Sequence, residues 1–292
     1  MNRFAWIVCN AFLNKAGSGK KTALVRFLPG PQQDLIRKIL ITEKNPLETP
    51  YHKDRLLQTV HYTWFTTFLR TLPEADVGIF LSCFPENTKK NLQDAILYSR
   101  PSIDLTECAK KYITSILYEN IVQSNPDVLP IELLPSCDLN TILDLTTSEL
   151  YILIEYLGIH DLGVEMKQII DTTLIKKIQG SLSPEKEDYL KKLSQKKEPV
   201  FFKRMELHKW DGKPESLKKV ITHRGINRLA KAAYAEEPSL SWYISRMLSV
   251  QDAGSFLGLC KPLNHPSAST LLIEQILEII PLIKPKSSKG DV

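Results

Sequence analysis

The chain has 292 residues, of which 43% are hydrophobic and 24% are charged, and its formal net charge at pH 7 is +5. This composition excludes a disordered or collagen-like chain and supplies enough apolar side chains for one large core or two smaller ones. No run of about eighteen apolar residues occurs, which argues against a membrane-spanning helix. The five cysteines are dispersed, as is typical of reduced thiols in a cytosolic protein: Cys9, Cys83, Cys108, Cys137 and Cys260.

Residues 1–50 give no clear fold and are assigned to an N-terminal extension. Their apolar stretch Phe4–Val8 is too short for a signal peptide and predicts a buried strand or helix edge. The run Ala16–Thr22 invites comparison with a phosphate-binding loop. That loop requires a glycine where Asn14 stands and a serine or threonine where Lys21 stands, so we interpret the run as a basic surface turn.

Residues 51–125 are predicted to form an N-terminal helical domain, because their apolar residues recur at helical spacing. Pro73 and Pro85 end two of its elements, and the short connections favour helices packed as antiparallel neighbours. Two stripes are clear: Val60, Trp64, Phe65, Phe68, Leu69 and Leu72, followed later by Ala109, Tyr112, Ile113, Ile116, Leu117 and Ile121.

The segment 126–138 contains three prolines and is predicted to be a linker between two domains, because proline restrains itself and the residue before it. Residues 139–283 form the predicted C-terminal helical domain. Its first helix carries the most distinct local signal, since Thr146 and Glu149 match a capping box. That helix is expected to end at Gly158 in a left-handed conformation. The charged tail 284–292 is predicted to be disordered.

Further helices are predicted after caps at Asp161 and Ser183, the first of them closing near Gly180. Residues 199–210 are interpreted as a loop or a short strand. Helical spacing returns over residues 217–234 with an interruption near Gly225, then after Pro238, and finally over 267–280. The predicted fold class is therefore mainly α, a globular protein of many short antiparallel helices with at most minor β content.

No pattern of residues predicts a catalytic, metal or cofactor site. The six histidines, among them His61, His160, His208, His223 and His265, are dispersed, and neither a C-x-x-C motif nor a G-x-S-x-G motif occurs. The pair Glu236-Glu237 precedes Pro238, where acids favour the start of a helix. The chain is therefore expected not to be an enzyme. A nucleotide-handling enzyme would depend on the defective glycine run described above.

The charges are unevenly distributed along the chain. Residues 100–175 contain 4 basic and 12 acidic residues, whereas residues 186–231 contain 14 basic and 6 acidic ones. Such polarity suits docking between two different partners. Because the basic segment also carries Phe201, Phe202 and Trp210, single-stranded nucleic-acid binding through residues 186–231 remains an alternative. The candidate partner-binding residues are Trp210, Lys218, Lys219, Arg224, Arg228 and Lys231.

The order of the predicted helices and short motifs over roughly residues 139–283 resembles that in the SctK/YscK family of bacterial type III secretion. The resemblance rests on Leu139–Leu145, Glu149-Leu150, Leu157-Gly158-Ile159, Ile169-Ile170, Arg224–Ala232, Pro238, Arg246, Ala268, Leu271-Leu272, Gln275-Ile276 and Ile280-Pro281. The His61-x-x-Trp64 helix also suits the N-terminal part of that family. Members are often shorter, so residues 1–50 stand outside the resemblance.

The resemblance implies a non-enzymatic adaptor of the sorting platform at the cytoplasmic face of the inner membrane. Its implied partners are the SctD-type inner-membrane ring protein and the SctQ-type cytoplasmic ring protein. The SctL-type stator and the SctN-type ATPase would be indirect partners. Neither a cofactor nor nucleic acid is implied, and attachment to the membrane would be through protein contacts only. A flagellar switch protein such as FliG is a second adaptor of the same kind and stays open.

Overall fold

The computed structural model describes residues 2–39, 43–101, 103–195, 198–200, 202–263 and 266–284. Every regular element in these ranges is a helix, which confirms the mainly α fold. Within the same ranges, no helix is both long and apolar enough to cross a membrane. Phe201, His265 and the tail beyond Lys284 lie outside the described residues.

The chain packs as two units. Unit 1 comprises Met1–Cys137 together with Glu237–Tyr243, and unit 2 comprises Asp138–Glu236 together with Ile244–Val292. The first boundary falls at the end of the proline-rich segment 126–138. Residues 1–50 and 51–125 both belong to unit 1.

Among its described residues, unit 1 contains three helices up to Ile39 and five more before the proline-rich segment. They are α1 (Arg3–Lys15), α2 (Ser18–Val25), α3 (Gly30–Lys38), α4 (Lys53–Thr59), α5 (Thr63–Thr71), α6 (Glu74–Leu81), α7 (Glu86–Ile96) and α8 (Glu107–Val122), followed by the short 3-10 helix η1 (Ile131–Leu133). The stretch Phe4–Val8 is thus helical and lies within α1. Gly17 has a φ of 88° and forms the turn into α2.

The proline-rich segment is folded into unit 1 and is not a free linker. Leu129 and Leu133 are buried. The amide of Leu129 donates to Ser239 Oγ at 3.1 Å, and its carbonyl accepts from the hydroxyl of Tyr243 at 2.7 Å. Proline prevents a long helix here, but the freed backbone groups find tertiary partners, which a sequence pattern does not reveal.

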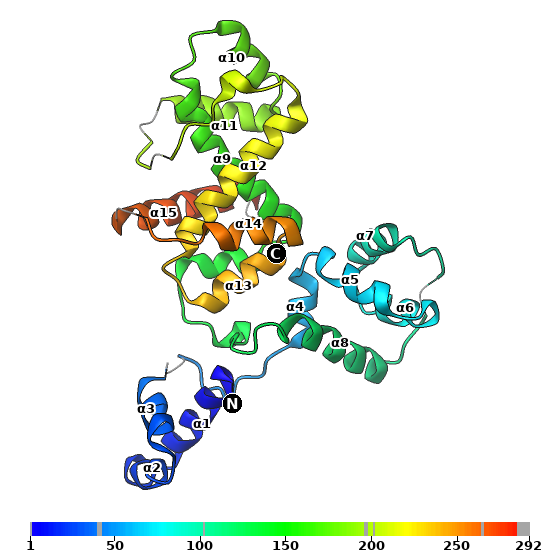
Figure 1. Cartoon of the computed structure of the whole chain (residues 1–292), viewed down its shortest axis with the longest axis vertical. Helices are drawn as coiled ribbons and strands as arrows, with labels where there is room; N and C mark the ends of the chain where they lie inside the picture. Colours follow the sequence, from blue (N-terminus) through cyan, green and yellow to red (C-terminus); the bar gives the residue numbers. More distant parts are fainter. Residues whose placement is uncertain are drawn as a thin grey trace, which may run out of the picture. The chain divides into compact units, whose positions relative to one another are not determined.

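Unit 2 is arranged around two twenty-residue helices, α9 (Thr147–Met166) and α12 (Pro214–Ala233). Figure 1 shows α11 beside α9, and α14 and α15 beside α12. The remaining elements are η2 (Asp138–Asp144), α10 (Thr172–Gln179), α11 (Pro184–Ser194), η3 (Leu207–Lys209), α14 (Val250–Leu259) and α15 (Pro266–Ile283), while α13 (Pro238–Met247) is shared between the units.

Two glycines allow α9 and α12 to cross in very close contact. A Cβ atom on Gly158 would lie 2.0 Å from the carbonyl oxygen of Ile221, and one on Gly225 would lie 1.7 Å from that of Ile154. The predictions that Gly158 ends a helix and that Gly225 interrupts one are therefore wrong. Both helices run through their glycine, which is needed for the approach of a neighbouring backbone and not for a turn.

The ends of the helices follow local chemistry. The capping box at Thr146 and Glu149 is confirmed: the Glu149 amide donates to the Thr146 hydroxyl, and the Thr146 amide donates to the Glu149 carboxylate at 2.7 Å. Asp161 does not cap a second helix, because α9 continues past it to Met166. The cap of α10 is Asp171, whose carboxylate accepts from two backbone amides.

Candidate functional site

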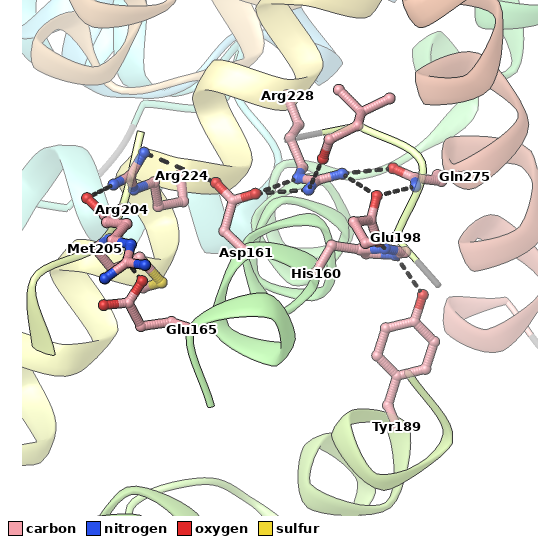
Figure 2. A network of polar contacts seen from close by, with 11 residues as sticks. His160, Asp161, Glu165, Tyr189, Glu198, Arg204, Met205, Arg224, Arg228 and Gln275 are labelled. Carbon is pink, nitrogen blue, oxygen red and sulfur yellow. Dashed lines mark hydrogen bonds and ion pairs between the residues drawn. The ribbon is translucent and has the colours of Figure 1, made fainter. Parts of the chain in front are cut away.

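A buried guanidinium connects several segments of unit 2. The side chain of Arg228, on α12, is completely shielded from solvent. Its five N–H groups face acceptors on three other segments, as Figure 2 shows: Asp161 Oδ1 at 2.9 and 2.6 Å, Glu198 Oε1 at 3.1 Å, Gln275 Oε1 at 2.8 Å and the carbonyl of Val200 at 3.2 Å. The guanidinium also lies 5.3 Å from the centre of the Phe202 ring. A fully satisfied Arg of this kind fixes the relative positions of the segments it joins.

Glu198 extends the network to a histidine and a tyrosine. Its Oε2 lies 2.7 Å from Nδ1 of His160, and Nε2 of the same ring lies 2.8 Å from the hydroxyl of Tyr189 on α11. Burial opposes the ionisation of Glu198, but the hydrogen bond from His160 and the charge of Arg228 outweigh it and lower its pKa to about 2. Glu198 is therefore a carboxylate at neutral pH.

Asp161 is less well satisfied than Glu198. Burial raises its pKa, and this effect exceeds the opposing influence of Arg228. Its Oδ2 atom is buried and has no hydrogen-bond partner among the described residues, although Arg224 Nη1 lies 3.9 Å away. The second oxygen of Asp161 therefore lowers the net stabilisation that the ion pair with Arg228 provides.

Two of the predicted partner-binding residues are committed to the interior of unit 2, which corrects the expectation for them. Arg228 offers no surface at all. Arg224 donates to the carbonyl of Arg204 at 2.6 Å, and only 16% of its side chain is exposed. Both side chains point toward α9 because Gly225 allows α12 to approach that helix closely. This approach depends on tertiary packing, so the basic composition of the segment does not reveal it.

The other predicted residues lie nearer the surface. The indole N–H of Trp210 donates to Lys213 and Ser216, while its ring packs on the core cluster formed by Ile159, Leu162, Ile178, Leu190, Leu207, Leu217 and Ile221. Lys231 donates to the carbonyl of Lys261 at 3.1 Å. Lys218 and Lys219 are exposed. The structure therefore does not bring the six residues together into one surface.

A pocket of about 170 Å³ does include Lys218. It lies between α9, the turn from α10 to α11, and the start of α12, with Ile159, Leu182, Leu217 and Ile221 among its apolar lining residues. Glu155 lies in its wall, almost buried, and is paired with Lys186 and, at 3.2 Å, with Lys218. An apolar floor beside paired charges suits the insertion of a partner's apolar side chain.

Some of the cations in the basic segment 186–231 are paired within unit 2. Arg228 faces two carboxylates, Lys186 and Lys218 share one, and Lys209 pairs with Glu206 at 2.6 Å. The buried Arg228 is not available to phosphates, whereas Lys209 and Lys218 remain largely exposed. Across the described residues, no group of three His, Cys, Asp or Glu side chains could hold a metal ion.

Few features of the sequence indicate the acidic and amide members of the network. His160 and Asp161 interrupt an apolar run between Ile159 and Leu162, and this polar pair inside a buried stretch was the available signal. Glu198 and Gln275 lie on segments far apart in the chain, and only folding brings them to Arg228. We found no match for this chain among protein-family models, curated proteins or solved structures.

Proposed function

We propose that this chain is a non-enzymatic helical adaptor of a bacterial type III secretion sorting platform. It would link the inner-membrane ring to the SctQ-type pod that bears the stator and the ATPase. The observation that carries the proposal is the extent of the resemblance to the SctK/YscK family. That resemblance starts at Leu139, and the compact packing of unit 2 starts at Asp138. The similar residues thus form one folded body, apart from the seven residues Glu237–Tyr243.

The pocket beside Glu155 is the contact surface we assign to one platform protein. Its floor is apolar and its wall contains three paired charges, Glu155 with Lys186 and Lys218. A leucine, methionine or phenylalanine of the partner would fill the floor, because burying such a side chain contributes about 1.5–3 kcal/mol. This assignment replaces Arg224 and Arg228, which unit 2 uses internally.

The test is co-purification of the tagged chain from its native bacterial lysate at moderate salt, comparing two variants. Ser181→Trp places a bulky ring at a position that lines the pocket. Ser194→Trp is the matched control, because both serine hydroxyls donate to the carbonyl of a nearby lysine, at 2.8 and 2.6 Å, and Ser194 is remote from the pocket lining.

We expect the unmodified chain and Ser194→Trp to retain ring, stator and ATPase proteins, and Ser181→Trp to lose one of them. Recovery of no secretion component would overturn the platform assignment. Recovery of flagellar switch proteins instead would favour the flagellar alternative. Equal recovery by both variants would keep the platform assignment and remove the pocket from the interface.

A further inference from the structure

Helices α1–α3 are rich in positive charge. Residues 2–39 contain seven lysines and arginines and a single acidic residue, Asp34, so their net charge is +6. The complete chain has a net charge of +5, which leaves the rest slightly acidic. A partner of these three helices is therefore selected by its negative charge.

Three of these cations surround one pocket of about 440 Å³ formed by α1, α2 and α3. Lys21, Arg26 and Arg37 line it together with Asn10, Thr22 and Gln33, and no acidic side chain is among the described residues that line it. The Lys21 ammonium donates to the side-chain oxygens of Asn10 at 2.8 Å and Asn14 at 2.6 Å. These neutral acceptors position the ammonium without cancelling its charge. The pocket therefore has the positive charge that binding of an anion requires.

Arg3 at the start of α1 is paired with Glu237, but the other ion pairs of these helices are exposed. Arg37 pairs with Asp34 at 3.5 Å, but about two-thirds of each side chain is exposed. Lys15 approaches Glu48 only to 4.0 Å, and both are similarly exposed. Exposed pairs of this kind contribute at most about 1 kcal/mol and are readily exchanged for a different anion.

The same helices expose large apolar side chains. Phe27, directly after α2, is 87% exposed, and Phe12 on α1 is 62% exposed. Leu24 and Leu35 are exposed as well, above a small core of Leu13, Val25 and Ile36 with Trp6, Cys9 and Leu28 packed against it. Cations alone would serve an acidic protein or a nucleic-acid backbone. Exposed phenyl and leucyl groups among many cations are typical of segments that lie in a membrane interface.

We propose that α1–α3 dock the protein on an anionic phospholipid surface. Lys21, Arg26 and Arg37 bind headgroup phosphates, and Phe12 and Phe27 enter the interface between headgroups and acyl chains. This contact goes beyond the adaptor function, in which membrane attachment runs through proteins only. Each cation near an anionic bilayer contributes about fivefold to the partition coefficient, so removing three reduces it about a hundredfold.

The experiment uses the full chain and sedimentation with vesicles of phosphatidylcholine, with or without phosphatidylglycerol as one lipid in three. The test variant is Lys21→Gln/Arg26→Gln/Arg37→Gln. The control, Lys90→Gln/Lys111→Gln/Lys192→Gln, removes the same charge from exposed lysines outside α1–α3. We expect about a hundredfold weaker binding to anionic vesicles for the test variant and less than tenfold for the control at about 0.1 M salt.

A second variant separates the apolar contribution from the charge. Phe12→Ser/Phe27→Ser should weaken binding to anionic vesicles by a factor that persists when salt is raised, because apolar insertion is not screened. Far-UV circular dichroism checks that each variant is folded. Equal loss in the test and control triples, or no preference of the unmodified chain for phosphatidylglycerol, would overturn the proposal.

Two competitors test other occupants of the pocket. If polyglutamate or a single-stranded oligonucleotide binds through the three cations while anionic vesicles do not, the site serves a polymeric anion and the bilayer proposal fails. Failure here is distinguishable from failure of the adaptor function. The test triple leaves unit 2 unchanged, so co-purification of platform proteins from a detergent extract should be unaffected by it.

Discussion

Replacing Arg228 separates a structural from a partner-binding role for the most basic part of the chain. Arg228→Met keeps an unbranched apolar stem but removes five hydrogen bonds and leaves the carboxylates of Asp161 and Glu198 buried without their cation. Breaking a buried pair in this way costs about 3–5 kcal/mol. A protein of this kind has a total stability of about 5–15 kcal/mol, so a large part of it should be lost.

The pH dependence of this loss has a defined sign. Burial already raises the pKa of Asp161 in the unmodified protein, so its ionised form opposes folding at neutral pH. Without Arg228 that pKa rises further. Protonation as the pH falls then stabilises the folded variant, and the gap between variant and unmodified protein should narrow from neutral pH to about pH 5.

Urea unfolding followed by far-UV circular dichroism at the two pH values measures both effects. The control is Lys219→Met, which removes one cation from an exposed position on the same helix and should change stability by less than about 0.5 kcal/mol. If Arg228→Met were as stable as Lys219→Met at neutral pH, or if the gap widened on acidification, the network would not hold unit 2 together as described.

Three further predictions concern the packing, the network and a helix cap. Gly225→Ala would place its Cβ 1.7 Å from a backbone oxygen and should destabilise the protein by about 2 kcal/mol or more. Gly254→Ala, whose Cβ would have nothing within 4 Å, should stabilise the protein by roughly 0.5–1 kcal/mol. Urea midpoints in the reverse order would contradict the close crossing of α9 and α12. Because the pKa of Glu198 is lowered from 4.5 to about 2, the stability that its carboxylate contributes should be lost as the pH falls through that window. The stability of Glu198→Gln should therefore depend less steeply on pH in acid. Identical acid titrations of the two proteins, monitored by circular dichroism, would exclude this role. Thr146→Ala should cost about 1 kcal/mol in chemical denaturation and Thr146→Ser much less, since serine keeps the oxygen that accepts from Glu149; equal losses would argue against the cap.

Local signals in the sequence predicted what local chemistry determines. Most residues of the two stripes lie on α5 and α8, although Val60 and Leu72 fall just outside α5. Helix α5 ends before Pro73, α6 ends before Pro85, and Thr146 caps α9. Each of these features depends on residues within one or two turns of each other. Helical periodicity and capping are properties of such short stretches, so a single sequence contains them.

The wrong predictions for the two glycines and for the arginines of the basic segment have a common cause. Gly158 and Gly225 look like helix breakers because glycine favours turns, yet each is needed for a backbone that arrives from another helix. Arg228 looks like a surface cation because most arginines are exposed. Only the presence of Asp161, Glu198 and Gln275 around it makes burial favourable.

The sequence by itself determined the class of the fold, most helix positions and the concentration of cations in residues 186–231. The tertiary structure decided which of those cations remain at the surface. It also gathered Lys21, Arg26 and Arg37 round one pocket. The physical reason is that burial and charge pairing depend on contacts between residues far apart in the chain, and these contacts form only when the helices pack.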